Sequence, residues 1–229
     1  MADYFSRVRA MGFRPRTVID VGVADGTFDL YEGFPDSRFL LIEPMVEFEP
    51  ALKRICRQHN GIYEIAAAGS RKGSAQIHFG ANLHGASLVA EDGGERSVSV
   101  ITVDALVEQH QMKGPFVLKI DVQGAEFEVI EGSVKTLEQT EIVVLEVPLF
   151  DFSKTGITMV EAVLKMKELG FVPHDIFDGL LRPLDGALGQ VDMAFVKKRG
   201  QFRDRDAWVS RTQAQRRRRF DRLRQILGI

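Results

Sequence analysis

The chain has 229 residues, a formal net charge of −2 and a hydrophobic fraction of 45%, which suit one globular α/β domain with a large core. Cys56 is its only cysteine, so the composition excludes an intrachain disulfide and favours a reducing compartment. The first residues show no apolar leader segment, and no stretch is long enough to span a bilayer. We therefore expect a cytoplasmic protein without a transmembrane segment.

Strands and helices are expected to alternate along most of the chain. Apolar or β-branched runs predict seven strands, at residues 17–21, 38–42, 62–67, 116–121, 142–147, 171–177 and 191–197. Apolar residues at helical spacing predict helices over residues 3–13, 25–33, 46–59, 125–137 and 158–169, and one that begins after Thr102 or Asp104. Three short β-like runs, separated by glycines, predict an inserted β segment at residues 75–79, 87–90 and 96–103.

This alternation predicts a mostly parallel, doubly wound sheet. The last two strands are joined by a turn over residues 179–189 that is rich in Gly and Pro and too short for a crossover helix. They are therefore expected to form an antiparallel pair at one edge of the sheet. A seventh strand inserted antiparallel is typical of the methyltransferase variant of the Rossmann architecture.

The charge of the chain is distributed unevenly. Residues 201–229 hold nine arginines against three aspartates, a net charge of +6, which leaves −8 for residues 1–200. Apolar residues recur among these arginines at helical spacing: Phe220, Leu223, Ile226 and Leu227. We expect a domain over residues 1–200 and a basic, amphipathic helical extension over residues 201–229. The extension is expected to pack on the domain. The alternatives for residues 203–229 are a homodimer contact with the acidic domain, an anionic membrane surface or a polyanionic acceptor, and the lack of interleaved aromatics disfavours nucleic acid.

The stretch from Thr17 to Gly26 combines a predicted strand with a glycine-containing turn. Asp20 lies near the end of the strand, Gly22 and Gly26 frame the turn, and Asp25 precedes Gly26. Glycines allow a sharp turn and the close approach of a ligand, although a purely structural turn is an alternative interpretation. The spacing is G-x-x-x-G and not G-x-G-x-x-G, which disfavours a dinucleotide.

A second acid, Glu43, follows the strand predicted over residues 38–42 and lies 21 positions after Gly22. A carboxylate at the tip of the second strand is placed to accept hydrogen bonds from ribose hydroxyls. A solvated strand end is the alternative, although Pro44 fixes the turn at this point. Together the two stretches predict a site for a nucleoside-containing cofactor.

Further acids are expected where the fourth and fifth strands end. Asp121 and Glu146 should both lie at the carboxyl edge of the sheet, where open α/β folds bind ligands. Such a pair suits a general base, the binding of substrate hydroxyls or a hard cation, whereas the lack of a His or Cys cluster disfavours a transition metal. Lys119 lies on the same face as Asp121, and one interpretation is a structural ion pair with Glu146.

These motifs together resemble the FkbM family of S-adenosylmethionine-dependent methyltransferases. The motifs are V-I-D-V-G-x-x-D-G, the acid after the second strand, L-K-I-D-V-Q-G-A-E-F-E-V-I-E-G and V-V-L-E-V. The resemblance covers about residues 17–177, and residues 119–132 are its most specific part. It implies a Rossmann-like class I methyltransferase fold, S-adenosylmethionine as cofactor and, most often, O-methylation of a hydroxyl on a sugar or secondary metabolite.

The resemblance also implies roles for single residues. The implied cofactor-binding residues are Asp20, Gly22, Asp25, Gly26, Glu43, Ala66, Ala67 and Asp121. Asp20 and the two glycines would line the methionine end of the cofactor, Glu43 would hold the ribose hydroxyls, and the two alanines would border the adenine. The chain departs from the family pattern in three places: Asp25 stands where Asn is usual, the third strand ends in alanines without an adenine-binding acid, and the arginine-rich extension is additional.

Methylation of an alcohol requires a base that removes the hydroxyl proton. The candidate bases are Asp121, Glu146 and His84, and the candidate acceptor-binding residues are Asn82, His84, Ser87 and Glu146. Residues 82–87 form a polar loop that would cap the site, although an exposed loop histidine is the alternative for His84. The acceptor would be a small molecule or a glycan, and no metal ligand is assigned.

Two other functions are compatible with the pattern. One is an NAD-type oxidoreductase on a similar sheet, which the glycine spacing and the antiparallel edge pair disfavour. The other is a cofactor-binding scaffold without catalysis.

Overall fold

A computed structural model of the chain describes residues 1–79, 94–152 and 157–204, together with residues 207, 209, 210 and 212. The chain divides into two units, Met1–Lys198 and Arg199–Ile229. The described part of the second unit contains a short 3-10 helix, η3 (Gln201–Arg203). Most of the basic helix predicted in this unit, residues 213–229, lies outside the described residues.

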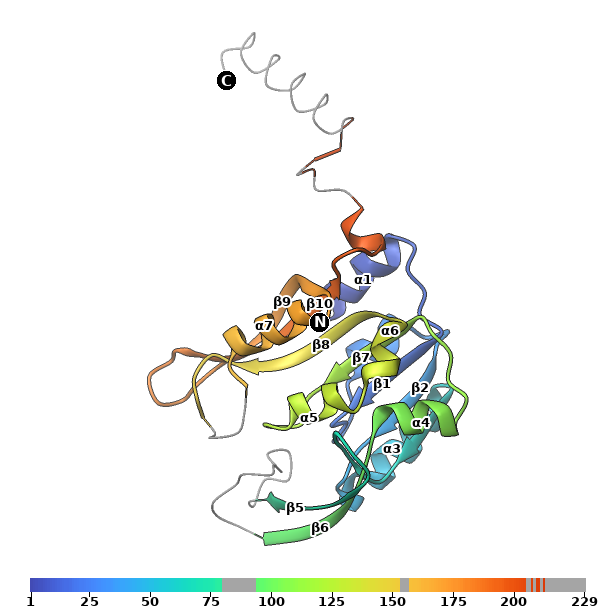
Figure 1. Ribbon diagram of the computed structural model, residues 1–229, viewed down its shortest axis with the longest axis vertical. Helices are drawn as coiled ribbons and strands as arrows, with labels where there is room; N and C mark the ends of the chain where they lie inside the picture. The colour runs from blue at the N-terminus through green and yellow to red at the C-terminus, as the bar shows by residue number, and fades with distance from the viewer. Residues whose placement is uncertain (80–93, 153–156, 205–206, 208, 211, 213–229) are drawn as a thin grey trace. The chain divides into compact units, whose positions relative to one another are not determined.

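A seven-stranded sheet forms the centre of the first unit (Figure 1). In spatial order its strands are β3 (Gly61–Glu64), β2 (Arg38–Ile42), β1 (Thr17–Val21), β7 (Phe116–Ile120), β8 (Thr140–Pro148), β10 (Leu188–Lys197) and β9 (Phe171–Leu181). The first five strands run parallel, and β10 is antiparallel to both β8 and β9. This confirms the predicted Rossmann-like class I methyltransferase fold, with the seventh strand inserted antiparallel beside the edge strand β9.

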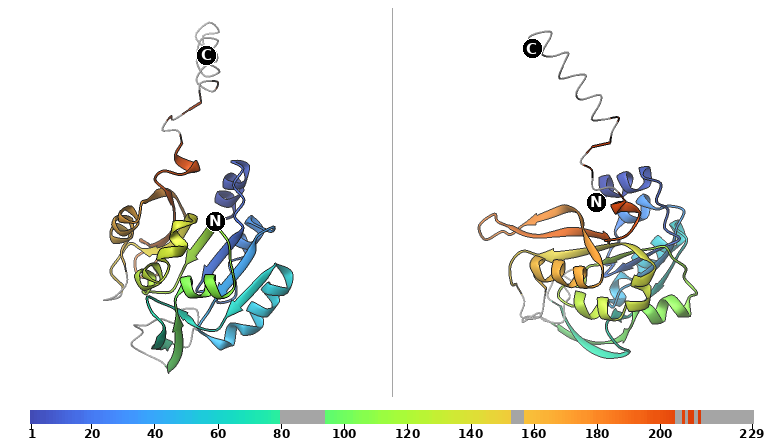
Figure 2. Two further views of the ribbon diagram at one scale, coloured as in Figure 1. Left: turned by 45° about the vertical axis from the view of Figure 1, so that its right-hand side comes forward. Right: turned by 45° about the horizontal axis from the view of Figure 1, so that its top comes forward.

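Helices lie on both faces of this sheet (Figure 2). The helices that follow the glycine loop and β2 are α2 (Phe28–Gly33), the 3-10 helix η1 (Val46–Phe48) and α3 (Glu49–Gln58), and α1 (Ala2–Ala10) precedes them. The later helices are α4 (Val103–Gln109), α5 (Glu126–Glu131), α6 (Val134–Glu138) and α7 (Met159–Glu168). Apolar residues of α4 to α7 share one buried cluster with Leu40 and Ile42 of β2, whereas Phe39 contacts Tyr31 of α2 on the opposite face.

The central strands are buried on both faces, which explains why the sequence located them well. Every residue of β1 and of β7 is buried, as expected for parallel strands covered by helices on each side. The only charged residues inside these two strands are Asp20 and Lys119, and they are direct neighbours in the parallel register. The sheet thus brings a buried acidic residue and a buried lysine together beside its carboxyl edge.

A separate three-stranded sheet is the predicted inserted β segment. Its order is β4 (Ala67–Ala68), β6 (Gly94–Ile101) and β5 (Gly73–Phe79), with β5 and β6 antiparallel. The strand predicted over residues 62–67 was wrong as one strand, because Gly61–Glu64 stays in the main sheet while Ala67–Ala68 pairs with β6. The strand predicted at residues 87–90 lies outside the described residues.

This small sheet is fixed against the chain that follows β2. Met45, Phe48, Ile77 and Val98 form a buried apolar cluster between the two parts. Beside that cluster, the guanidinium of Arg96 donates to both carboxylate oxygens of Glu47 at 2.6 Å. The small sheet is therefore held next to the carboxyl edge of β2.

The helix predicted over residues 125–137 is instead two helices, α5 and α6. The break lies at Gly132, where a Cβ atom would come within 2.0 Å of the backbone oxygen of Gly69. Ser133 then donates its hydroxyl to the Val129 carbonyl at 2.6 Å, which ends the first helix. Helical spacing alone does not reveal such a break, because apolar residues continue on the same face.

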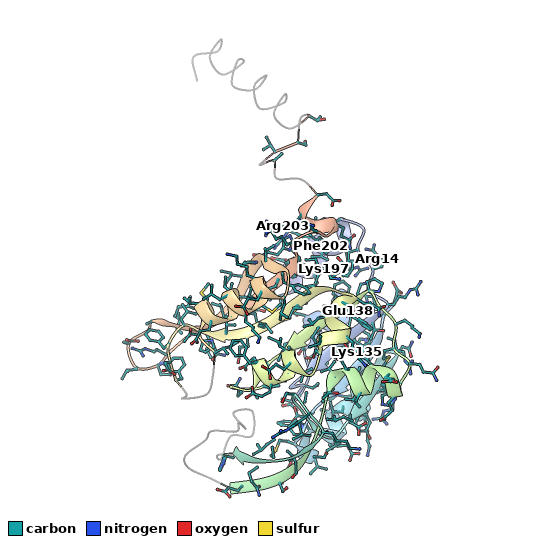
Figure 3. All side chains as sticks on the ribbon, in the orientation of Figure 1. Arg14, Lys135, Glu138, Lys197, Phe202 and Arg203 are labelled. Atoms are coloured by element: carbon teal, nitrogen blue, oxygen red, sulfur yellow. The ribbon has the colours of Figure 1, made fainter. Side chains whose placement is uncertain are left out.

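Other helix boundaries follow local capping. The Thr102 side chain accepts the backbone N–H of Ala105, which confirms the start of the helix predicted near this residue. Thr158 and Glu161 form a capping box at the start of α7. At the end of the sheet away from the site, Lys197 Nζ of β10 donates to the Glu138 carbonyl of α6 (Figure 3). Within the described part of the chain, no helix has the length and apolar character needed to cross a membrane.

Candidate active site

A cavity of about 550 Å³ opens at the carboxyl ends of β1, β2, β7 and β8. Of the residues predicted to form the site, those that line it are Gly22, Asp25, Gly26, Glu43, Ala67, Asp121 and Glu146. Asp20 and Ala66 are buried and do not line the cavity. The remaining three, Asn82, His84 and Ser87, lie outside the described residues.

The loop after β1 reaches the end of β7 because Gly22 has no side chain. The φ angle of Gly22 is +79°, and a Cβ atom on it would lie 1.7 Å from the Asp121 carbonyl oxygen. Ala24 and Gly26 also have positive φ angles, 46° and 117°. Three left-handed residues in five do not form a helix, so the helix predicted to start at Asp25 begins only at Phe28. The cavity therefore borders the backbone loop of residues 22–26 first, and Thr27, the N-cap of α2, follows that loop in its lining.

Glu43 holds this loop from the tip of β2. Its Oε2 atom accepts the backbone N–H of Ala24 at 2.9 Å, and its Oε1 atom accepts that of Met45 at 2.8 Å. Burial raises the pKa of Glu43, and these two backbone donors offset the rise only in part. The carboxyl group is therefore a fixed part of the cavity wall, with lone pairs left on both oxygens for ligand hydroxyls.

Asp20 lies behind the cavity and not in its wall. Its Oδ2 atom accepts the Tyr31 hydroxyl at 2.6 Å, and no hydrogen-bond donor among the described residues reaches its Oδ1 atom. Lys119 Nζ lies 3.7 Å from that Oδ1 atom. Complete burial raises the pKa of Asp20, although Lys119 and Tyr31 act in the opposite direction. Asp20 therefore supports the site through its neighbours.

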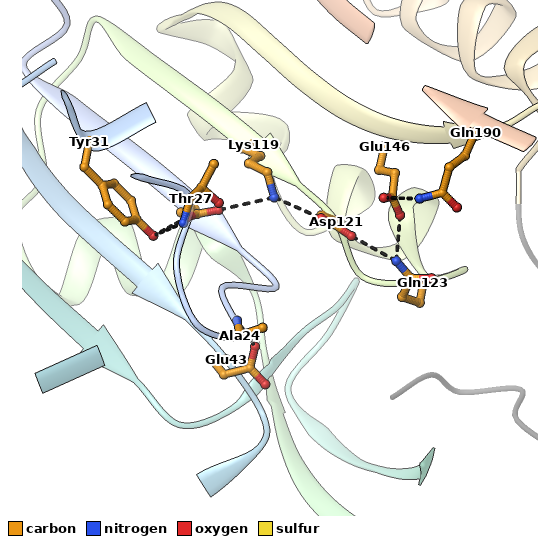
Figure 4. Close-up of polar contacts among 10 residues, drawn as sticks. Ala24, Thr27, Tyr31, Glu43, Lys119, Asp121, Gln123, Glu146 and Gln190 are labelled. Carbon is orange, nitrogen blue, oxygen red and sulfur yellow. Dashed lines mark hydrogen bonds and ion pairs between the residues drawn. The ribbon is translucent and has the colours of Figure 1, made fainter. Parts of the chain in front are cut away.

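Lys119 connects Asp20 to the cavity (Figure 4). Its Nζ atom lies 3.1 Å from Asp121 Oδ2, so it bridges the two aspartates. The ion pair considered for Lys119 with Glu146 is not formed; the aspartates are its partners. Burial opposes the charge of Lys119, but Asp121 and Asp20 raise its pKa. Burial likewise opposes the ionisation of Asp121, but the ammonium of Lys119 lowers its pKa overall.

Two carboxamides continue this polar chain to Glu146. Gln123 Nε2 donates to Asp121 Oδ1 at 3.1 Å and to Glu146 Oε2 at 2.6 Å. Gln190 of β10 donates from its Nε2 to Glu146 Oε1. Figure 4 shows the resulting line of polar contacts from Tyr31 to Gln190 along the carboxyl edge of the sheet.

The carboxyl groups along this line differ in basicity. Burial and the neighbouring Asp121 carboxylate raise the pKa of Glu146 to about 8. Asp192 faces Glu146 across the antiparallel pair, and burial raises its pKa to about 7. Asp121 is held as a carboxylate by Lys119, so Glu146 is the more basic of the two predicted catalytic carboxyl groups.

Four of these residues were not predicted as site residues: Tyr31, Gln123, Gln190 and Asp192. Gln123 lies inside the motif that runs from Lys119 to Gly132, where its position between Asp121 and Gly124 was a usable signal. No comparable signal marks Gln190, which follows a glycine at the start of the last strand. Tyr31 resembles any apolar residue of an amphipathic helix.

The cavity has the chemical surfaces that S-adenosylmethionine requires. Apolar side chains of Phe48, Ile77 and Val100 line it, and they suit the adenine ring of the cofactor. Glu43 offers a carboxylate to ribose hydroxyls, and residues 22–26 present the backbone of their loop to the cavity. The residues present therefore fit this cofactor.

Comparisons with known proteins identify the family of the chain. The sequence matches the family described as the methyltransferase FkbM domain over residues 20–173. It is also similar to the hexuronic acid methyltransferase AglP of Haloferax volcanii, with 35% identity over 54 residues. That similarity spans 24% of this chain and 23% of the relative, about a quarter of its length.

Solved structures resemble the fold only distantly. The 1,6-didemethyltoxoflavin-N1-methyltransferase of Burkholderia thailandensis is 13% identical, with a TM-score of 0.43 over 84% of this chain and 76% of that one. The magnesium protoporphyrin IX methyltransferase of Synechocystis PCC 6803 is 9% identical, with a TM-score of 0.48 over 86% and 76%. Similarity at this level carries no argument about the acceptor. The family match covers more than half of the chain, including the glycine loop, Glu43 and the Lys119 to Glu146 cluster, so the chain belongs to the FkbM family of S-adenosylmethionine-dependent methyltransferases.

Proposed function

We propose that this protein methylates a hydroxyl oxygen of a sugar or of another small polyhydroxylated molecule. The observation that carries the proposal is the placement of Glu146, a cavity-lining carboxyl group whose pKa is raised to about 8. A neutral alcohol is a weak nucleophile, and its methylation needs a base with a pKa near the working pH. Glu146 fits that requirement better than the ion-paired Asp121 does.

The residues around the cavity would divide the work of binding. Residues 22–26 and Asp121 would hold the methionine end of the cofactor, Glu43 would accept its ribose hydroxyls, and Ala67 would border the adenine. When bound, S-adenosylmethionine supplies the electrophilic methyl group. The loop and the carboxylates would fix the acceptor in line with that methyl group, and such positioning supplies much of the rate of a two-substrate reaction.

Glu146 would accept the proton that the acceptor hydroxyl loses as its oxygen forms the new bond to carbon. Lys119 would keep Asp121 ionised beside it, which raises the basicity of Glu146. Asp20 and Tyr31 would hold Lys119 from behind and would not touch either substrate.

A sugar acid is the first acceptor to test, because the curated relative is named as a hexuronic acid methyltransferase. A hexuronic acid carries both hydroxyls and a carboxylate. Methylation of a hydroxyl gives an ether, whereas methylation of the carboxylate gives an ester and needs no base. The two products differ in stability to mild alkali, so the chemistry of the product tests the role of Glu146 directly.

The experiment uses the full chain, S-adenosylmethionine with a labelled methyl group, and two acceptor panels: hexuronides and neutral glycosides. We expect label in the product that survives mild alkali, as an ether does. Label that is released by mild alkali would show carboxylate methylation and contradict the proposal. Tight binding of S-adenosylhomocysteine without transfer to any acceptor would support the non-catalytic scaffold instead.

A further inference from the structure

Gln123 has a backbone conformation that residues other than glycine rarely adopt. Its φ angle is 56°, in the left-handed region, and it is followed by Gly124 at 109°. A left-handed conformation costs a residue with a side chain about 1–2 kcal/mol. Such a residue persists where its surroundings hold it in place, and here the surroundings are two carboxylates.

The orientation of the Gln123 carboxamide follows from its partners. Asp121 Oδ1 lies at 3.1 Å and Glu146 Oε2 at 2.6 Å, and an ionised carboxylate only accepts hydrogen bonds. When Glu146 is ionised, the NH₂ group must therefore face both acids, and its two hydrogens are both used. Gln123 thus links Asp121, which is paired with Lys119, to Glu146, which has no cation in direct contact among the described residues.

Gln190 reaches the other oxygen of Glu146 from the opposite side. It lies opposite Pro148 in the pairing of β10 with β8 and donates to Glu146 Oε1. The pairing of β10 with β9 is irregular on both sides of this residue, between Leu188 and Gln190 and again between Gln190 and Asp192. Irregularities of this kind redirect a side chain, and they often occur next to functional sites.

We propose that Gln123 and Gln190 are positioning residues that clamp the Glu146 carboxylate between two neutral donors and hold it ready to accept the acceptor proton. The proposal rests on the proposed function of Glu146. The charged groups that face Glu146 are Asp121 and Lys119 from the β7 side and Asp192 from β10. None of them donates a hydrogen bond to ionised Glu146, although protonated Glu146 can donate its proton to Asp121. The two carboxamides are therefore the donors that orient the ionised form.

The clamp has a consequence for proton affinity. Burial and Asp121 favour the protonated form of Glu146, whereas donors to its oxygens favour the ionised form. Loss of one donor should therefore raise the pKa of Glu146 further above its present value near 8. Activity that depends on ionised Glu146 would then appear only at higher pH.

The test replaces each carboxamide and measures Glu146 directly. The Gln190→Leu variant loses the hydrogen-bond donor but has a side chain of similar volume. The Gln123→Asn variant keeps an amide and tolerates a positive φ angle, but its side chain is one methylene too short to reach both acids. The ¹³C NMR titration of the Glu146 carboxyl is read in glutamate-labelled protein and assigned by its disappearance in Glu146→Gln. Gln58→Leu, an exposed change at the end of α3, is the matched control.

We expect each clamp variant to raise the Glu146 midpoint by about one pH unit and to lower kcat at neutral pH about tenfold, with KM little changed. Gln58→Leu should match the wild type. If the midpoint and the pH profile of kcat both stay at wild-type values in the two clamp variants, the clamp is refuted. If the midpoint shifts but the wild-type protein methylates no acceptor, the clamp stands as geometry and the proposed function fails. Because either variant suffices, failure of one to fold does not remove the test.

Discussion

A Cβ atom on Gly22 would lie 1.7 Å from the backbone carbonyl oxygen of Asp121. The loop after β1 and the end of β7 are therefore in contact through their backbones, and this contact shapes the cavity between them. The Asp121 N–H also donates to the Val21 carbonyl at 3.0 Å, so a backbone hydrogen bond joins the two chain segments directly before the glycine.

Gly22→Ala should separate these two segments. A methyl group cannot share the space with the Asp121 carbonyl, so we expect the affinity for S-adenosylhomocysteine to fall at least about tenfold, measured by calorimetry. Gly170→Ala is the matched control, because Gly170 has a similar φ of +82° but no atom within 4 Å of its added Cβ. The control should lose about 1–2 kcal/mol of stability and keep its affinity. Equal affinity losses in both variants would show that strain, and not the collision, is responsible.

Glu43 should matter for cofactor binding through both its shape and its charge. Glu43→Gln places an NH₂ group against one of two backbone donors, those of Ala24 and Met45, so the loop loses one of its two anchors. We expect S-adenosylhomocysteine to bind about tenfold to a hundredfold more weakly to Glu43→Gln and Glu43→Ala. The control Glu108→Gln, an exposed change on α4 away from the cavity, should bind normally. Unchanged affinity in Glu43→Ala would show that the ribose is placed elsewhere.

The buried Lys119 should be a large contributor to stability. Lys119→Met leaves Asp20 and Asp121 without their shared cation, which for a buried pair costs about 3–5 kcal/mol in urea denaturation. Adding Asp20→Asn removes one of the uncompensated acids and should recover about 1–3 kcal/mol. Lys135→Met, an exposed change on α6, should cost less than about 0.5 kcal/mol. A double variant no more stable than Lys119→Met alone would contradict this coupling.

The sequence predicted the central sheet well because its strands carry strong local signals. The runs at residues 17–21 and 38–42 are apolar or β-branched and bounded by turns, and their limits match β1 and β2. Burial on both faces removes any alternation, however, so the sequence could not tell which way a side chain on β1 points. Asp20 was therefore expected in the cavity wall, although it faces Tyr31 and Lys119 behind it.

Contacts that depend on distant segments could not be read from local pattern. The break at Gly132 results from the close passage of Gly69, which is more than sixty positions earlier. Gln190 reaches Glu146 through the pairing of β10 with β8, two strands that are distant in the sequence. The sequence thus located the acids of the site, whereas the amides that join them required the three-dimensional structure.

The central claim is that Glu146 accepts a hydroxyl proton, and the pH dependence of methyl transfer to a neutral glycoside tests it most directly. The pKa of Glu146 is raised to about 8 and only its ionised form can accept a proton, so activity should be gained as pH rises. We predict that kcat/KM increases about tenfold per pH unit below about pH 8 and then levels off. Glu146→Gln should lower kcat about 10²- to 10⁴-fold and abolish the rise, while S-adenosylhomocysteine binds within about threefold of wild type. A Glu146→Gln protein that keeps the wild-type kcat and the same rise with pH would contradict the account.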